Sequence, residues 1–88
     1  MAEPFHLLIV APGKTIFDGK AESAVIPAAD GMMGILPGHA PFYGTLGEGA
    51  ITARTYASAP LSIKVTSGVV QVLPDEVTIL AESCESPP

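Results

Sequence analysis

The residues that could carry chemistry in this chain are few and lie far apart in the sequence. The two histidines, His6 and His39, and the single cysteine, Cys84, do not fall within the short spacings at which such residues hold a metal ion. His39 lies in the segment 37–41, and a histidine in such a turn usually hydrogen-bonds to the backbone around it. We therefore expect neither a metal site nor a bound cofactor.

The common catalytic motifs are also absent from the sequence. It contains no G-x-S-x-G elbow, no phosphate-binding P-loop and no G-x-G-x-x-G fingerprint. The glycine-rich segment 44–49 has no following helix or lysine to hold a phosphate, so it is predicted to be a flexible connection between strands. The acidic residues are dispersed along the chain, although folding could still bring two of them together. The sequence predicts a protein that is not an enzyme.

Sugar, nucleic-acid and lipid binding find little support. Sandwich domains that bind sugars usually stack them on aromatic rings, but this chain has no Trp and only Tyr43 and Tyr56 as tyrosines. The net charge is −5, and the few basic residues are scattered singly, whereas phosphate backbones and anionic lipids attract clustered Lys and Arg. These basic residues are Lys14, Lys20, Arg54 and Lys64.

The elements that must position these residues are predicted to be short strands. Nine glycines and nine prolines interrupt the chain and leave little room for a helix. Alternation of apolar and polar residues, as in 77–82, is typical of strands with one face in solvent. Short strands with turns at close spacing favour a sandwich or a barrel. We expect strands at 5–10, 15–17, 21–27, 32–36, 51–55, 61–66, 69–73 and 77–82, the last three forming a meander.

The apolar content is higher than a domain of this size needs for its core. The chain has 88 residues, of which 48% are hydrophobic and 15% are charged, and this length predicts one domain with a thin core. In the predicted strand 5–10 both alternating faces are apolar. This strand is therefore either buried between two layers or covered on one face by another chain. The surplus favours a surface for a partner protein.

The sequence also bears on the cellular compartment. Cys84 is the only cysteine, so no internal disulfide can form and a reducing compartment fits best. The first six residues lack a basic signal region, and the apolar run 7–11 is far shorter than a membrane helix. We expect a soluble, cytoplasmic chain that reaches a membrane only through another protein.

The segment 30–41, which reads D-G-M-M-G-I-L-P-G-H-A-P, is unusually constrained. Proline fixes φ, and glycine allows backbone conformations that other residues resist. A stiff, neutral loop suits docking better than catalysis. The residues to which we assign a structural role in this loop are Gly34, Pro37, Gly38 and Pro41.

This segment resembles the epsilon subunit of the F-type ATP synthase. Four further stretches resemble strands of that family in the same order: F-H-L-x-I-V from residue 5, I-F-x-G from 16, S-G-V-V-x-V from 67 and V-T-I-L-A-E from 77. The resemblance implies an all-β fold, a two-layer antiparallel β-sandwich of about ten short strands. We expect this domain to span residues 1–83 and to be followed by a short polar tail, 84–88.

The resemblance also implies a function. Members of the family sit on the central stalk of the rotor, bind the gamma subunit and the c ring, and help couple proton translocation to ATP synthesis without catalysing a reaction. The implied location is the cytoplasmic face of the inner membrane, as a peripheral subunit. Most bacterial epsilon chains continue into a helical hairpin that can inhibit ATP hydrolysis. Because this sequence ends at Pro88, we expect coupling without that brake.

Contact residues follow from the resemblance position by position. Asp30, Gly31 and Met32 match the turn that contacts the c ring, and Met32 stands where the family commonly has an acidic residue. An apolar contact is therefore expected there in place of an ion pair. Positions that face the gamma subunit match Ala11, His39 and Gly44, and the neighbouring Phe42 and Tyr43 are apolar candidates for the same surface.

Two other functions fit the same strand pattern. A free-standing β-sandwich that binds a small ligand or sugar would have a concave pocket with convergent polar groups. A small hydrolase would have carboxylates with perturbed pKa values in a cleft. Copurification with gamma and c subunits distinguishes the rotor subunit from both.

Overall fold

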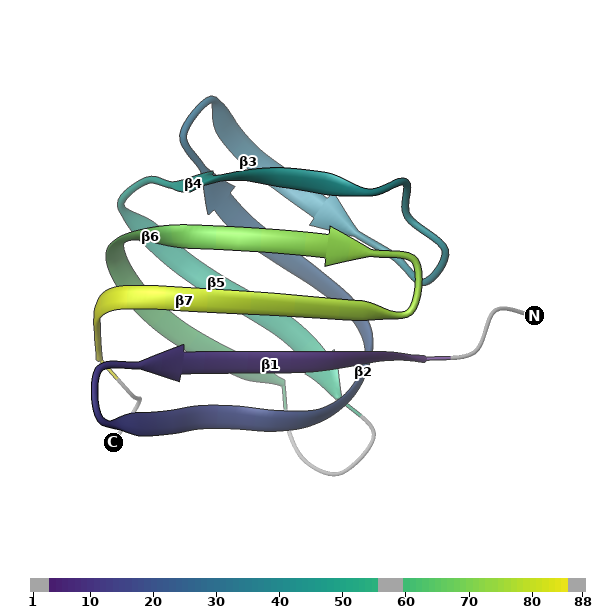
Figure 1. The fold of residues 1–88 in the computed structure, drawn as a ribbon, viewed down its shortest axis with the longest axis horizontal. Coiled ribbons are helices and arrows are strands. Elements are labelled where there is room, and N and C mark those ends of the chain that lie inside the picture. The colour runs from purple at the N-terminus through teal and green to yellow at the C-terminus, as the bar shows by residue number, and fades with distance from the viewer. Residues whose placement is uncertain (1–3, 56–59, 86–88) are drawn as a thin grey trace.

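The computed structural model describes residues 4–55 and 60–85, and these form seven strands (Figure 1). The strands are β1 (Phe5–Ala11), β2 (Lys14–Ala28), β3 (Gly31–Ile35), β4 (Phe42–Leu46), β5 (Gly49–Thr55), β6 (Leu61–Leu73) and β7 (Glu76–Glu85).

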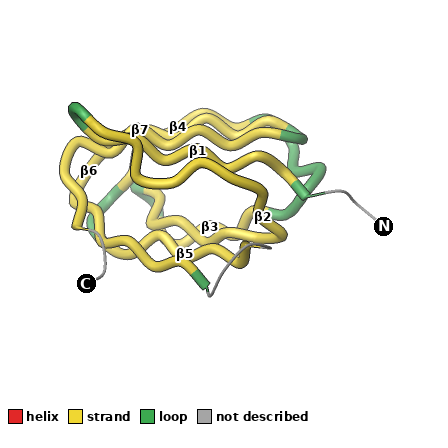
Figure 2. Tube along the Cα trace, turned by 90° about the horizontal axis from the view of Figure 1, so that it is seen from below, coloured by secondary structure: helices red, strands yellow, loops and turns green. Residues whose placement is uncertain are grey.

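The strands stack in two layers, which Figure 2 shows from the side. The β7 layer contains β1, β7 and β4 with the first half of β2 and the second half of β6. The β5 layer contains β5 and β3 with the second half of β2 and the first half of β6. The predicted all-β, two-layer sandwich is therefore confirmed.

Two long strands pass from one layer to the other, so the sandwich has seven strands in its described part where about ten short ones were expected. β2 pairs with β1 up to Ala21 and then with β5 and β3. β6 pairs with β5 over 61–65 and with β4 over 68–72. Register shifts beside Ser23 and Ser67 bend the backbone while pairing continues on both sides. Two pairs of predicted strands are therefore single strands: 15–17 with 21–27, and 61–66 with 69–73.

The close approach of β6 and β7 at this bend requires a glycine. A Cβ at Gly68 would lie 2.3 Å from the carbonyl oxygen of Leu80 and 3.0 Å from the Cα of Ala81. Any side chain at this position would force the two strands apart, which explains the glycine at the point where β6 enters the β7 layer.

β1 and β7 pair in parallel, which departs from the predicted fully antiparallel sandwich. The register joins His6 to Glu76 and Val10 to Leu80. The remaining strand pairs of the described residues are antiparallel. Apolar alternation is the same for both directions, and no short turn connects β1 to β7, so the sequence pattern could not reveal the direction of this pair.

The glycine-rich segment 44–49 was wrongly predicted to be a flexible connection. Its first half belongs to β4, which pairs with β6 from Phe42 to Leu46. The Phe42 ring lies over Gly44, where a Cβ would lie 2.6 Å from the ring Cζ. The glycine hides the alternation of this strand, because Phe42 and Leu46 face inward on either side of a position without a side chain.

The core lies between the layers and is entirely apolar. No polar or charged side chain of the described residues is buried. β1 contributes Phe5, Leu7 and Ile9 at no more than 1% exposure, whereas Leu8 and Val10 on its other face are only half-buried. The chain itself therefore leaves the second apolar face of β1 partly open. The largest fully buried side chains are Phe5, Leu7, Ile9, Ile26, Ile35, Ile51, Ile63, Val65, Val70, Val72, Val77 and Ile79.

The last strand is longer than predicted. β7 continues through Glu85, past the expected end at residue 82 and into the expected tail 84–88, of which residues 86–88 lie outside the described part. No helix occurs between residues 4 and 85 outside the gap at 56–59, so none there could cross a membrane.

Candidate docking face

Within the described part of the chain, no three His, Cys, Asp or Glu residues come together as metal ligands. His39 is a turn histidine as interpreted: its Nδ1 lies 2.6 Å from the carbonyl oxygen of Ala40, and it must donate because a carbonyl only accepts. The functional candidate among the described residues is a surface with exposed apolar side chains.

The surface that stands out is the outer side of the β7 layer. Val77, Ile79 and Ala81 of β7 point into the core, so the residues between them point outward. The same alternation places outward residues on β1, β6 and β4 beside them. We call this set the docking face; it consists of Leu8, Val10, Tyr43, Thr45, Val69, Gln71, Thr78 and Leu80.

Strand register divides the docking face into two rows. The first row crosses the layer from β1 to β4 and is mostly aliphatic; it contains Val10, Leu80, Val69 and Thr45. The second row lies beside it and is mostly polar and aromatic; it contains Leu8, Thr78, Gln71 and Tyr43. None of these side chains carries a formal charge.

The apolar members of the docking face are substantially exposed. Tyr43 is 76% exposed, Leu80 49% and Val69 39%. Fully burying one aliphatic side chain of this size stabilises a complex by roughly 1.5–3 kcal/mol. Contiguous exposed apolar residues on a small protein mark an interaction surface more often than a free one. The arrangement can thus bind an apolar surface of another molecule.

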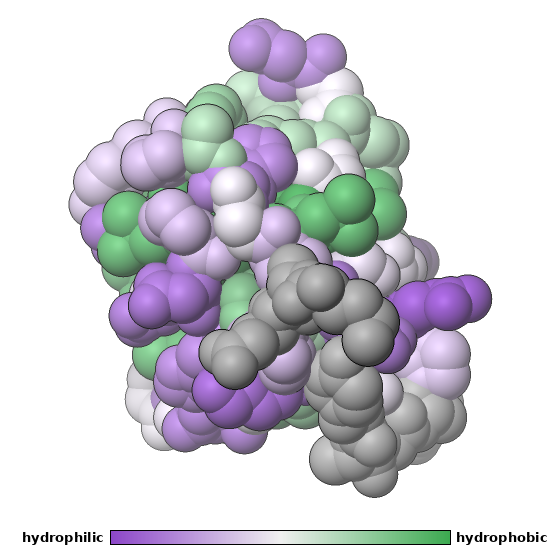
Figure 3. All heavy atoms as spheres, turned by 90° about the vertical axis from the view of Figure 1, so that its right-hand side faces the viewer, coloured by the Kyte–Doolittle hydropathy of each residue, from purple (hydrophilic) through white to green (hydrophobic). Residues whose placement is uncertain are grey.

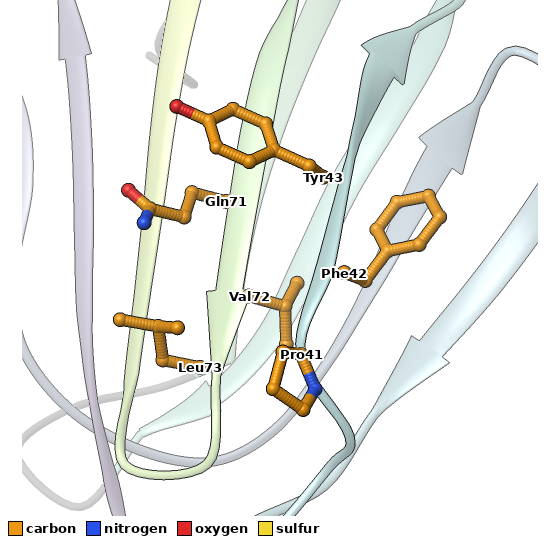
Figure 4. A pocket seen from close by; sticks show the side chains of 6 residues that line it. All are labelled: Pro41, Phe42, Tyr43, Gln71, Val72 and Leu73. Atoms are coloured by element: carbon orange, nitrogen blue, oxygen red, sulfur yellow. The ribbon is translucent and has the colours of Figure 1, made fainter.

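Tyr43 stands at the β4 side of the docking face, next to an open hollow (Figure 4). Its ring leans over β6 toward Gln71, whereas the ring of Phe42 points to the opposite side of β4 and packs against the core. The residues that line the hollow are Pro41, Phe42, Tyr43, Gln71, Val72 and Leu73.

The residues predicted to contact the gamma subunit are only partly brought together. Tyr43 belongs to the docking face, and Ala11 borders it, lining a second open hollow with Val10 and Leu80. Phe42 and Gly44 face inward, with the ring over the glycine. His39 lies in the β3–β4 loop, and Figure 1 shows this loop at the opposite end of the sandwich from the β1–β2 turn, where β1 ends at Ala11.

The turn predicted to contact the c ring is exposed. Asp30, Gly31 and Met32 stand at the β2–β3 turn, and Met32 is 63% exposed. Gly31 has φ of 132°, a conformation that favours glycine. The turn is tied to the β4–β5 connection by hydrogen bonds from the amides of Ala29 and Gly47 to the carbonyls of Thr45 and Pro27.

The predicted structural loop is anchored to the β6–β7 turn. The amide of Gly38, which has φ of 84°, donates to the carbonyl of Pro74 over 2.8 Å, and the amide of His39 donates to Leu36. Gly34, in contrast, lies within β3 with no atom near its absent Cβ, so nothing in the structure requires a glycine there. Figure 3 looks onto this end of the sandwich, where hydrophobic and hydrophilic residues are mixed.

Sequence reasoning missed Val69 and Leu80 as members of the surface. The signal for Leu80 was present, because it is the one large apolar residue in the outward set of 76–82. Val69 could be placed only from the bend at residue 67, which decides the face of each later residue of β6.

Comparison with known proteins gives one consistent family. The model of the family described as "ATP synthase, Delta/Epsilon chain, beta-sandwich domain" matches residues 4–87. The ATP synthase epsilon chain of Koribacter versatilis is 42% identical over 99% of this chain, which covers 61% of that protein. Epsilon chain 1 of Methylococcus capsulatus is 40% identical over 94% of this chain and 59% of its own length. The chain thus spans about three fifths of the curated relatives it matches.

Solved structures share the fold at low sequence identity. A chain in the cryo-EM structure of the Euglena gracilis mitochondrial ATP synthase, containing OSCP, F1 and the c-ring, aligns with a TM-score of 0.86 at 18% identity. The alignment covers 94% of this chain and 53% of that one. A chain in the central stalk and c-ring structure of the Tetrahymena thermophila mitochondrial ATP synthase aligns with a TM-score of 0.77 at 15% identity, over 97% and 68% of the two chains.

Proposed function

We propose that this chain, which belongs to the delta/epsilon β-sandwich family of ATP synthase, is a non-catalytic subunit of the rotor's central stalk. In this role it binds the gamma subunit and the c ring, and helps to couple proton translocation to ATP synthesis. Its place is on the cytoplasmic face of the membrane, which it reaches through the complex.

The observation that carries this proposal is the docking face. A sandwich with an all-apolar core has already buried what its own stability needs, yet Tyr43, Val69 and Leu80 remain exposed on neighbouring strands. A partner that covers them removes apolar area from water, and this burial stabilises the attachment of the subunit while the rotor turns. We assign this face to the gamma subunit.

The c ring is assigned to the β2–β3 turn. Met32 presents an exposed, flexible apolar side chain at the tip of a turn that hydrogen bonds hold to the β4–β5 connection. Such a turn can rest on another protein without deforming. Because the turn and the docking face belong to different parts of the sandwich, one subunit can contact both partners at the same time.

Stiffness supports the same role. Both layers are continuous through β2 and β6, so a force applied at the turn is carried by hydrogen-bonded strands to the docking face. Densely packed interiors transmit strain because they are hardly compressible. A domain of this construction can pass torque between two partners.

Site-specific crosslinking tests both assignments. A photoreactive benzoylphenylalanine replaces Tyr43, Met32 or, as a control in the β5 layer, Thr52, and each variant is coexpressed with the gamma and c subunits of the same organism. We expect crosslinks to gamma from position 43, crosslinks to c from position 32, and none to either subunit from position 52. The proposal is wrong if the tagged wild-type chain purifies alone, or if position 52 crosslinks as strongly as position 43.

A further inference from the structure

The outward residues of β7 form a charge pattern that the apolar docking face alone does not explain. They are Glu76, Thr78, Leu80 and Glu82, so one acid stands at each end of this outward set. Both glutamates are exposed. The two glutamates are six positions apart along an extended strand, which corresponds to about 20 Å. β7 lies between β1 and β6, so these acids bracket the middle of the docking face.

Within the described part of the chain, neither glutamate has a basic partner. Glu82 accepts a hydrogen bond from the hydroxyl of Ser67 over 2.9 Å, which holds its carboxylate at the edge of the face. Glu76 pairs in register with His6 on one side and Leu73 on the other, but the ion pair of His6 is with Asp18. Both carboxylates are therefore available to a partner.

The chain's own cations lie outside the bracketed area. Lys14 and Lys20 belong to the half of β2 in the β7 layer, where β1 separates them from β7, and Arg54 belongs to β5. Lys64 belongs to β6 and pairs in register with Ala50 and with Glu85, beyond Glu82. The docking face itself is uncharged, and the whole chain carries a net charge of −5. A partner with acids near the two glutamates would be repelled, whereas one with cations there would be attracted and oriented.

We infer that the surface which covers the docking face carries two basic side chains about 20 Å apart, one facing Glu76 and one facing Glu82, with an uncharged apolar stretch between them. This inference rests on the proposed function, and it describes the chemistry of the gamma surface bound there. Two separated anchors fix the direction in which β7 lies on the partner. The apolar middle holds the subunit, and the acids set its orientation.

Charge reversal on this strand tests the inference. The double variant E76K/E82K is compared with E22K, which makes the same kind of change at an exposed residue outside the docking face, beside Arg54. Binding to the immobilised gamma subunit of the same organism is measured by biolayer interferometry at low and high salt. Thermal unfolding of each variant confirms that the fold is intact.

We expect E76K/E82K to bind about tenfold more weakly than wild type at low ionic strength. The deficit should shrink to about twofold at roughly 0.5 M salt, where rim charges are screened. The neutral variant E76Q/E82Q should lose about threefold at low salt, which separates lost attraction from added repulsion. E22K should stay within about twofold of wild type at both salt concentrations.

The outcomes distinguish the inference from the proposed function. If the wild-type chain does not bind gamma at all, the proposed function fails. If it binds gamma but E76K/E82K behaves like E22K at low salt, or the deficit does not shrink with salt, the inference is overturned while the proposed function stands.

Discussion

The two outer faces of the sandwich cover the same core but differ in the types of side chain that they expose. The outer side of the β7 layer has an uncharged centre, the docking face, which exposes Tyr43, Val69 and Leu80, with Glu76 and Glu82 at the two ends of β7. The outer side of the β5 layer is hydroxylic and basic over β5 and β6, with Thr52, Arg54, Ser62, Thr66 and Lys64, whereas over β2 and β3 it exposes Val25 and Met32. Folding requires only that the inward residues be apolar, so the difference between the outer faces reflects what each one meets.

Two valines, one in each layer, form a closely matched pair for comparing the two faces. Val69 on the docking face is 39% exposed, and Val25 in the β5 layer is 37% exposed. Val69 lies between Leu80 and Thr45, whereas Val25 lies between Gly34 and Thr52. At nearly the same exposure, one valine belongs to an aliphatic row, whereas the register row of the other contains a glycine and a threonine. Exposure alone therefore does not mark an interaction surface; the neighbours do.

The largest effect on stability is expected at Gly68, where β6 and β7 approach each other closely. Gly68→Ala places a Cβ 2.3 Å from the carbonyl oxygen of Leu80. We expect it to lower the free energy of unfolding by about 2–4 kcal/mol, measured by urea denaturation. Gly34→Ala in the β5 layer is the control: its Cβ meets nothing and its φ is not positive. It should be neutral or stabilise by up to about 1 kcal/mol. Equal losses in both variants would show that β6 and β7 do not approach closely at residue 68.

The next largest effect is expected when each exposed valine is replaced by a charged residue, because only one of the two faces should then lose affinity for the gamma subunit. Val69→Glu places a carboxylate within the aliphatic row, where a bound partner would have to desolvate it. We expect affinity for the gamma subunit to fall by at least about 30-fold, measured by titration calorimetry. Val25→Glu should leave affinity within about twofold of wild type, because that residue has no apolar row around it. Similar losses in both variants would mean that the two faces do not differ in function.

Truncation of Tyr43 measures how much one side chain of the docking face contributes to gamma binding. Tyrosine is a frequent hot spot of interfaces, and Tyr43 is the most exposed large apolar side chain of the described residues. Tyr43→Ala should weaken gamma binding by about tenfold, since a ring of this size is worth more than about 1 kcal/mol when covered. Tyr43→Phe keeps the ring and should keep most of the affinity. If Phe and Ala weaken binding equally, the hydroxyl is the contact and the ring is not.

The smallest effect is expected at the border of the face. Asp18 pairs with His6 at the β2 side of β1, and both side chains are at least partly exposed. Because exposed ion pairs contribute at most about 1 kcal/mol, Asp18→Asn should shift the midpoint of thermal unfolding only slightly. It should also leave gamma binding within about twofold, which would mark where the docking face ends. A loss as large as that of Tyr43→Ala would extend the face onto β2.

Local pattern could predict much of this fold. Alternation located the inward residues of β7 but could not decide between the two apolar faces of β1, and the density of turns indicated a sandwich. The parallel pairing of β1 with β7 and the passage of β2 and β6 between layers depend on which strands meet in space. β4 was not predicted because Gly44 leaves a gap in its inward set, which only the Phe42 ring above it explains.

The candidate site was predictable only in part for the same reason. Tyr43 was expected as a surface residue and is one, but its neighbour Phe42 faces the core because a strand alternates. Val69 and Leu80 come together from two strands whose register is offset by a bulge, and that register is not visible in either strand alone. The pairing of strands, rather than the residues of each, assembles the docking face.

We propose that the gamma subunit covers the outer side of the β7 layer and leaves the outer side of the β5 layer exposed. Hydroxyl-radical footprinting of the chain, free and bound to the gamma subunit, measures this directly for exposed side chains. We expect Tyr43 and Leu80 to become protected in the complex. Val25 and Leu36, which are exposed on β2 and just after β3, should react as in the free chain. Protection of Val25 and Leu36 with unchanged reactivity of Tyr43 and Leu80 would contradict this proposal.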